Sequence, residues 1–170
     1  YERYKAHRPE TPSDLGSQFA QTEELLAAFA IPVFKEAGYE ADDIIATVAK
    51  ILDRKKDIEI IVVTGDLDAL QLVGPGLKVY AMKKGVSETV IYDKKAVRER
   101  YGLKPGQLLD FKGLKGDPSD NIPGVKGVGE KTAAELIRNF GSVEGVFKAL
   151  KKGDKKIDVL IVYLQKERTI

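Results

Sequence analysis

The segment IEIIVVTG at residues 58–65 constrains the fold more than any other part of the sequence. Apart from Glu59, its residues as far as Thr64 are all β-branched, which is typical of a strand buried on both faces of a parallel sheet. Helical spacing of apolar residues precedes it at residues 13–30 and again at residues 40–56. A helix that leads directly into a buried strand indicates the α/β class.

Two further apolar segments, at residues 77–82 and 89–93, predict a hairpin or two neighbouring strands. From Lys94 onward the apolar spacing becomes helical. The expected helices occupy residues 94–101, 105–112, 130–140, 142–150 and 157–166. Strands that alternate with helices and then give way to helices alone predict a mainly parallel sheet flanked by helices in residues 1–104, followed by a helical part in residues 105–170.

Composition and charge exclude several kinds of chemistry. The absence of cysteine rules out disulfides, zinc–thiolate sites and thiol nucleophiles. The only histidine, His7, lies in a polar N-terminal arm, so we expect no Ser-His-Asp triad. No apolar run is long enough to span a bilayer. The net charge of +2 hides basic groups at residues 3–8 and 148–156, which can serve an anionic polymer or, for the second group, be only a solvated lysine tail.

Acidic residues occupy three places where carboxylates can meet: a helix start, the end of the buried strand, and a turn before a glycine-rich stretch. They are Glu40, Asp42, Asp43, Asp66, Asp68, Asp117 and Asp120. Taken singly, each is explained by helix capping or by a turn, because acids are common at both.

Taken together, the acidic residues predict a metal site. Asp66 and Asp68 follow a buried strand, and the carboxyl ends of strands in open α/β sheets form ligand crevices. Glu40 and Asp43 share a helix face, whereas Asp42 is turned aside in an ideal helix. Converging carboxylates repel one another without a cation, and Mg²⁺ and Mn²⁺ prefer oxygen ligands. Two such ions, about 3.5–4 Å apart, can promote phosphodiester cleavage.

The stretch PGVKGVGEKT at residues 123–132 misses the phosphate-loop pattern of nucleotide-binding proteins, because one residue intervenes before the lysine and no buried strand precedes it. A glycine hairpin between two helices fits better, since Gly127 and Gly129 permit backbone conformations closed to other residues. The amides of the following helix, with Lys126 and Lys131, would attract a phosphate backbone without distinguishing its sequence. An ordinary tight turn is the alternative.

Four segments occur in order along nearly the whole chain: YKAHRPETP, GYEADDIIAT, TGDLDALQLV and GLKGDPSDNIPGVKGVGEKTA. Together they resemble successive motifs of the 5′-nuclease domain of bacterial DNA polymerase I, in the flap endonuclease superfamily. The resemblance implies a PIN-like α/β fold with a helix–hairpin–helix-like element in the C-terminal part. It also implies metal-dependent, structure-selective hydrolysis of DNA 5′ ends and 5′ flaps, leaving a 3′-hydroxyl and a 5′-phosphate.

The resemblance assigns roles to individual residues. The seven acidic residues would surround two divalent cations, Mg²⁺ or Mn²⁺, directly or through water. Lys5 and Arg8 match the base of the family's arch, where they would steer the scissile phosphate, and Tyr4 beside them would contact DNA. The hairpin would grip the duplex backbone and hold a K⁺ ion. Its expected DNA contacts are Gly124, Lys126, Gly127, Gly129, Lys131 and Thr132.

The sequence departs from the family pattern at its N-terminus. Family members begin with two strands that carry an Asp-Gly metal motif, a further aspartate and an arginine, and these are not in this sequence. We therefore expect a chain that retains affinity for the DNA backbone but is impaired in catalysis. Its expected partners are nicked, branched or 5′-flap DNA in the bacterial cytoplasm and nucleoid and, in a longer polypeptide, a polymerase domain. The alternatives are a non-catalytic module that binds duplex backbone and, less well supported, a small-molecule phosphatase.

Overall fold

The computed structural model describes residues 1–10, 12–55, 57–84, 87–154 and 157. Within them the α-helices are α1 Ser13–Ala28, α2 Ala41–Leu52, α3 Lys94–Tyr101, α4 Leu108–Lys115, α5 Glu130–Phe140 and α6 Val143–Lys151. The strands are β1 Ile60–Thr64, β2 Leu77–Lys84 and β3 Glu88–Tyr92, and the 3-10 helices are η1 Leu67–Leu72, η2 Pro105–Gln107 and η3 Pro118–Asp120. Apart from Ile157, the helix predicted at residues 157–166 lies outside the described residues.

The three strands form one sheet in the order β1-β2-β3. Strand β1 pairs with β2 in parallel, with Ile60 opposite Leu77. Strand β2 pairs with β3 in antiparallel fashion, with Tyr80 opposite Ile91. The α/β class is therefore confirmed, but the sheet is mixed rather than mainly parallel, because β2 and β3 form the hairpin that the sequence left as one of two options.

One face of this sheet carries much of the hydrophobic core. Val62, Val79 and Ala81 are buried there. On the opposite face, Ile61 is 54% exposed and Val63 is 61% exposed. The prediction that this strand is buried on both faces is wrong for the part of the chain that the structure describes, because nothing there covers the face that carries Ile61 and Val63.

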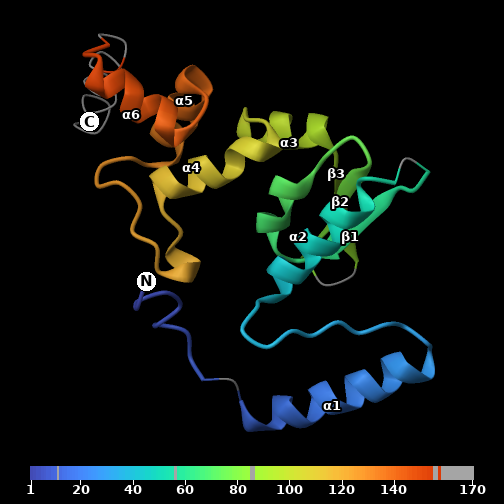
Figure 1. The fold of residues 1–170 in the computed structure, drawn as a ribbon. Coiled ribbons are helices and arrows are strands. Elements are labelled where there is room, and N and C mark those ends of the chain that lie inside the picture. Colours follow the sequence, from blue (N-terminus) through green and yellow to red (C-terminus); the bar gives the residue numbers. More distant parts are fainter. Residues whose placement is uncertain (11, 56, 85–86, 155–156, 158–170) are drawn as a thin grey trace.

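Helix α1 stands apart from the rest of the molecule, and the segment between it and α2 crosses the gap in Figure 1. Its helical spacing was predicted correctly, yet Phe19, Leu25 and Phe29 along its apolar stripe are all more than half exposed. Helical spacing follows from local sequence, whereas burial needs a partner surface. The described residues bring no such surface to this stripe.

Helix α4 joins the sheet half of the molecule to its helical half. It contacts η1 beside the sheet and also packs against α5 and α6. Leu108, Phe111 and Leu114 bury its inward side. The 3-10 helix η1 directly follows β1, and η3 directly follows α4. The packing of α4 against η1 therefore brings the end of β1 close to the η3 turn.

The turn that begins with η3 is closed by a crossing of two backbone segments at Gly116 and Gly124. Both glycines have positive φ values, 83° and 63°. A Cβ atom on Gly124 would lie 2.3 Å from the Gly116 nitrogen, which only glycine avoids. Gly127 also has a positive φ, 88°, as the hairpin predicted. Gly129 has φ −93°, so the special conformation predicted there is wrong.

Replacing Gly124 with alanine should lower the free energy of unfolding by about 2–4 kcal/mol, because the new methyl group meets backbone and the φ value is strained. Chemical denaturation monitored by circular dichroism measures the change. Gly113→Ala is the matched control: its Cβ would meet nothing within 4 Å, and in a helix interior it should stabilise by about 0.5–1 kcal/mol. Equal stability of the two variants would contradict the proposed crossing constraint.

Candidate metal centre

The acidic residues of the candidate site also cap the elements that carry them. Asp66 caps η1, its Oδ1 accepting a hydrogen bond from the Asp68 amide at 2.9 Å. Asp117 caps η3, its Oδ1 accepting from the Ser119 amide at 3.0 Å and from the Ser119 hydroxyl at 2.5 Å. In each case the cap uses one carboxylate oxygen. The second oxygen is left for another partner, which for Asp117 is the Lys112 ammonium at 2.7 Å.

At the start of α2, Glu40 and Asp43 form a reciprocal capping box. The Asp43 carboxylate accepts from the Glu40 amide at 3.0 Å. Asp42, which an ideal helix would turn aside, nevertheless lines the same cleft as these two residues. The reason is that the N-terminus of α2 itself faces the cleft, so the side chains of its first turn all border it.

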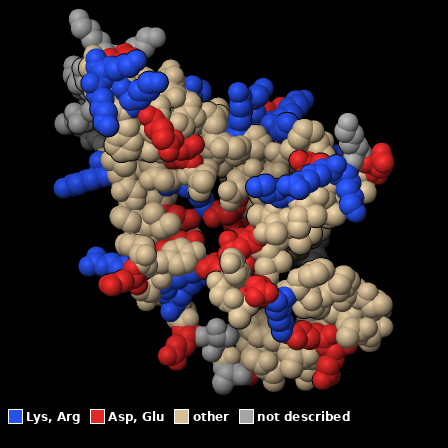
Figure 2. Space-filling model, viewed as in Figure 1, with Lys and Arg blue, Asp and Glu red and all other residues tan. Residues whose placement is uncertain are grey.

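These segments enclose a cleft of about 600 Å³. Figure 2 shows acidic side chains gathered around a hollow in the middle of the molecular face. The predicted site residues that line it are Tyr4, Lys5, Arg8, Glu40, Asp42, Asp43, Asp66, Asp68 and Asp120. Asp117 lies at its margin: one oxygen from each of Asp68, Asp117 and Asp120 falls within 4.8 Å of the other two. The structure thus brings all seven acidic residues to one place.

The negative charge in this cleft is only partly compensated. Burial, together with the neighbouring carboxylates of Asp66 and Asp68, raises the pKa of Asp42 above its ordinary value. Among the described residues, no basic side chain forms an ion pair with Asp42 or Asp66. A site of this kind favours a hard cation, because a cation relieves the mutual repulsion and accepts oxygen ligands.

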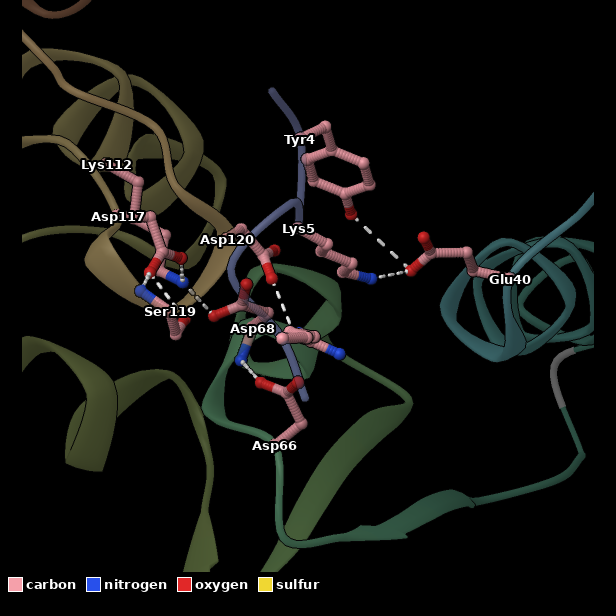
Figure 3. A network of polar contacts seen from close by, with 10 residues as sticks. Tyr4, Lys5, Glu40, Asp66, Asp68, Lys112, Asp117, Ser119 and Asp120 are labelled. Atoms are coloured by element: carbon pink, nitrogen blue, oxygen red, sulfur yellow. Dashed lines mark hydrogen bonds and ion pairs between the residues drawn. The ribbon is translucent and has the colours of Figure 1, made fainter. Parts of the chain in front are cut away.

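The N-terminal arm supplies two of the basic side chains in the cleft. The Lys5 amide donates to the Asp120 carbonyl at 3.1 Å, which fixes the arm on the η3 turn. The Lys5 ammonium pairs with Glu40, and this hydrogen bond lowers the pKa of Glu40 (Figure 3). Arg8 pairs with Asp120, with 2.7 Å between Nη2 and Oδ1. Both residues therefore border the cleft, where they engage carboxylates in this structure.

Lys112 is a member of the cluster that the sequence did not reveal. Its ammonium pairs with Asp68 and with Asp117, the second contact being 2.7 Å (Figure 3). Burial disfavours its charge, but the hydrogen bonds to both carboxylates outweigh burial and raise the pKa of Lys112. The available signal was its position on α4, four residues after the buried Leu108 and thus on the inward side of the helix.

The glycine hairpin lies outside this cleft. Lys126 and Gly127 are exposed, and Gly129 caps α5 without any side-chain hydrogen bond, so the first amides of α5 have no side-chain cap. Lys131 borders a separate cavity of about 240 Å³ between α3, α4 and α5. Thr132 is only 8% exposed, so its side chain packs inward.

Comparison with known proteins assigns the chain to a family. Residues 1–102 match the family model "5′-3′ exonuclease, N-terminal resolvase-like domain", and residues 103–167 match "5′-3′ exonuclease, C-terminal SAM fold". The chain therefore belongs to the 5′-3′ exonuclease family. In the part of the chain that the structure describes, no helix combines the length and apolar character needed to traverse a lipid bilayer.

Its curated relatives include bacterial DNA polymerases I. DNA polymerase I of Bacillus caldotenax is 46% identical over 162 residues, covering 94% of this chain and 18% of that protein. DNA polymerase I of Mycobacterium tuberculosis H37Rv is 49% identical over 146 residues, covering 86% of this chain and 16% of that protein. The chain thus spans less than a fifth of the length of these relatives.

Solved structures with a similar fold include nucleases crystallised with metals and DNA. A bacteriophage T5 D15 flap endonuclease, in a pseudo-enzyme–product complex with DNA and metal ions, gives a TM-score of 0.70 at 26% identity, covering 88% of this chain and 57% of that one. T5 5′-exonuclease with bound zinc gives 0.70 at 26% identity, covering 95% and 60%. The catalytic core of Rad2 in complex with DNA substrate gives 0.57 at 25% identity, covering 91% and 50%.

Lys112 and Ser119 lower the pKa of Asp117 to about 2, compared with 3.8 for an ordinary aspartate. Because the folded chain binds this proton less tightly than the unfolded chain, the carboxylate stabilises the fold above about pH 4, and the effect disappears as the pH falls toward 2. Asp117→Asn should therefore be less stable by about 2 kcal/mol at pH 7, with the gap closing between about pH 4 and pH 2.

Urea unfolding in EDTA at several pH values measures this gap. Asp57→Asn, at an exposed position, is the control and should follow the wild type throughout. A difference between wild type and Asp117→Asn that stayed constant across the acidic range would show that the carboxylate's charge is not what stabilises the turn.

Proposed function

We propose that this chain is a metal-dependent, structure-selective nuclease domain that hydrolyses DNA at 5′ ends and 5′ flaps. The observation that carries the proposal is the convergence of six carboxylates, from the start of α2, the end of β1 and the η3 turn, in one cleft, with Asp117 at its margin. Family membership supports the reaction class. Carboxylates from three separated segments repel one another unless a cation lies between them. Their convergence therefore indicates a function that uses a cation.

The residues present fit divalent cations. The donor set consists of carboxylate oxygens, and three of them already lie within 4.8 Å of one another, which suits Mg²⁺ or Mn²⁺ better than a soft metal. Two cations held by the seven acidic residues would supply an activated water and stabilise the leaving oxygen. Lys5 and Arg8, from the arm that crosses the cleft, would bind and orient the scissile phosphate.

The C-terminal part, from residue 105, would hold the duplex. Lys126 and Lys131 are exposed beside the N-terminus of α5, where unpaired amides and the helix dipole favour a phosphate group. A K⁺ ion at the hairpin would be bound by its backbone carbonyls. Residues 1–104 would carry the chemistry, and a polymerase domain, as in the relatives, would be a further partner within a longer polypeptide.

The metal centre is tested by titrating Mn²⁺ into the purified chain in a calorimeter. The wild type should bind, and Asp66→Ala/Asp68→Ala should lose at least tenfold in affinity, because loss of even a group that only orients a metal ligand costs roughly 10–100-fold. Cleavage of a 5′-flap duplex should require the same metal and disappear in the double variant. Lys78→Ala, on the sheet away from the cleft, is the control.

The rival function is a non-catalytic module that binds duplex backbone through the hairpin. Intact DNA binding without any affinity for Mg²⁺ or Mn²⁺ would favour that module and overturn the nuclease. Metal binding that is lost in the double variant would exclude it. A small-molecule phosphatase is a poorer fit, since it leaves the hairpin and the basic arm without a role.

The hairpin lysines should contribute to DNA affinity through phosphate contacts. Lys126→Ala/Lys131→Ala should weaken binding of duplexes of any sequence and reduce the slope of log K against log salt by about 2, since each phosphate contact contributes about 0.9. Fluorescence anisotropy at several KCl concentrations, without divalent ions, measures this slope. The control Lys50→Ala/Lys78→Ala removes the same charge from α2 and β2 and should leave the salt slope unchanged. Equal slopes for the two double variants would refute the phosphate contacts proposed for Lys126 and Lys131.

A further inference from the structure

The three carboxylates best placed to share one cation are already engaged by basic side chains. The Lys112 ammonium contacts Asp68 and Asp117, the second at 2.7 Å, and Arg8 contacts Asp120 at 2.7 Å. Asp42 and Asp66, which line the same cleft, have no ion-pair partner among the residues that the structure describes. The carboxylate cluster therefore has two unequal halves.

We infer that Lys112 is a positioning residue that acts as an internal substitute for one divalent cation. A cation that binds at Asp68 and Asp117 has to displace the ammonium, whereas a cation that binds beside Asp42 and Asp66 does not. The two metal sites of the proposed nuclease therefore differ in affinity, and the weaker one is the site that Lys112 fills. This inference rests on the proposed function, because it concerns the same metal centre.

The position of Lys112 allows its ammonium both to fill the weaker site and to leave it when a cation binds. Its backbone belongs to α4, which is anchored by the buried Phe111 and Leu114, so the ammonium is held where the carboxylates meet. A lysine carries a compact charge on a flexible stem. Lys112 lines a mostly apolar cavity of about 100 Å³ that also borders Leu108 and Leu109. The displaced side chain can therefore move along this cavity without refolding the helix.

The ammonium also preserves the geometry of the weaker site. Three carboxylate oxygens within 4.8 Å of one another would separate by mutual repulsion if no positive charge lay between them. Lys112 holds two of these three carboxylates together (Figure 3). The arriving cation then meets ligands that are already assembled, at the expense of competing with the ammonium for them.

Calorimetric titration of the full chain with Mn²⁺ tests the inference. Lys112→Met should bind the weaker cation about tenfold more tightly, the order expected for losing a partly exposed, charge-assisted competitor. Lys115→Met is the control, because it removes the same charge from the same helix. The Lys115 ammonium lies 5.1 Å from the Phe111 ring centre and contacts no carboxylate among the described residues. The Mn²⁺ affinity of this variant should match that of the wild type. Lys112→Arg keeps the charge and should keep the weak affinity.

Lys112→Met binding no more tightly than Lys115→Met would overturn the inference while leaving the metal centre in place. No binding to the wild type would overturn the proposed nuclease and this inference with it. Nuclear magnetic resonance of lysine ammonium groups in the wild type gives a test that does not depend on Lys112→Met folding. The Lys112 ammonium signal is identified as the one that is missing from the spectrum of Lys112→Arg. In the wild type this signal should shift on addition of Mg²⁺, and an unchanged signal at saturating Mg²⁺ would refute displacement of the ammonium.

Discussion

Repulsion among carboxylates that share one cleft is the constraint on which the rest of this structure depends. Asp68, Asp117 and Asp120 come from segments about 50 residues apart, yet their oxygens lie within 4.8 Å of one another. Three basic side chains offset this repulsion from different directions, Lys5 and Arg8 from the N-terminal arm and Lys112 from α4. The arm is fixed on the η3 turn because both a backbone hydrogen bond, from the Lys5 amide, and an ion pair, from Arg8, end on Asp120.

Capping and metal binding are compatible uses of the same side chains. Asp66 and Asp117 each cap a 3-10 helix with one oxygen, which leaves the other for a cation or a lysine. The sequence set these two explanations against each other, but a cap fixes the side-chain rotamer and so orients the remaining oxygen. A local structural role therefore prepares the residue for the proposed function, and it explains why acidic residues concentrate at element starts around this cleft.

The parts of the fold and of the site that the sequence predicted are those governed by local rules. Helical spacing and the strand-end rule predicted α2, α5 and the proximity of Asp66 to the acidic start of α2. The failures depend on tertiary partners. The open face of β1 has no cover in the described residues, and the ion pairs of Lys112 form only because α4 packs beside η1. No spacing along the chain reveals such neighbours.

The separation between cleft and hairpin has a consequence for how the proposed nuclease would receive DNA. Exposed lysines at the hairpin attract phosphates over about 8–10 Å at physiological salt, whereas the cleft presents an excess of carboxylates that repel them. A duplex bound at the hairpin would therefore gain nothing by advancing a phosphate into the cleft until cations reversed the local charge. In the proposed nuclease, metal binding would thus be required for phosphate placement as well as for chemistry, because the carboxylates proposed to hold the cations would otherwise repel the phosphate.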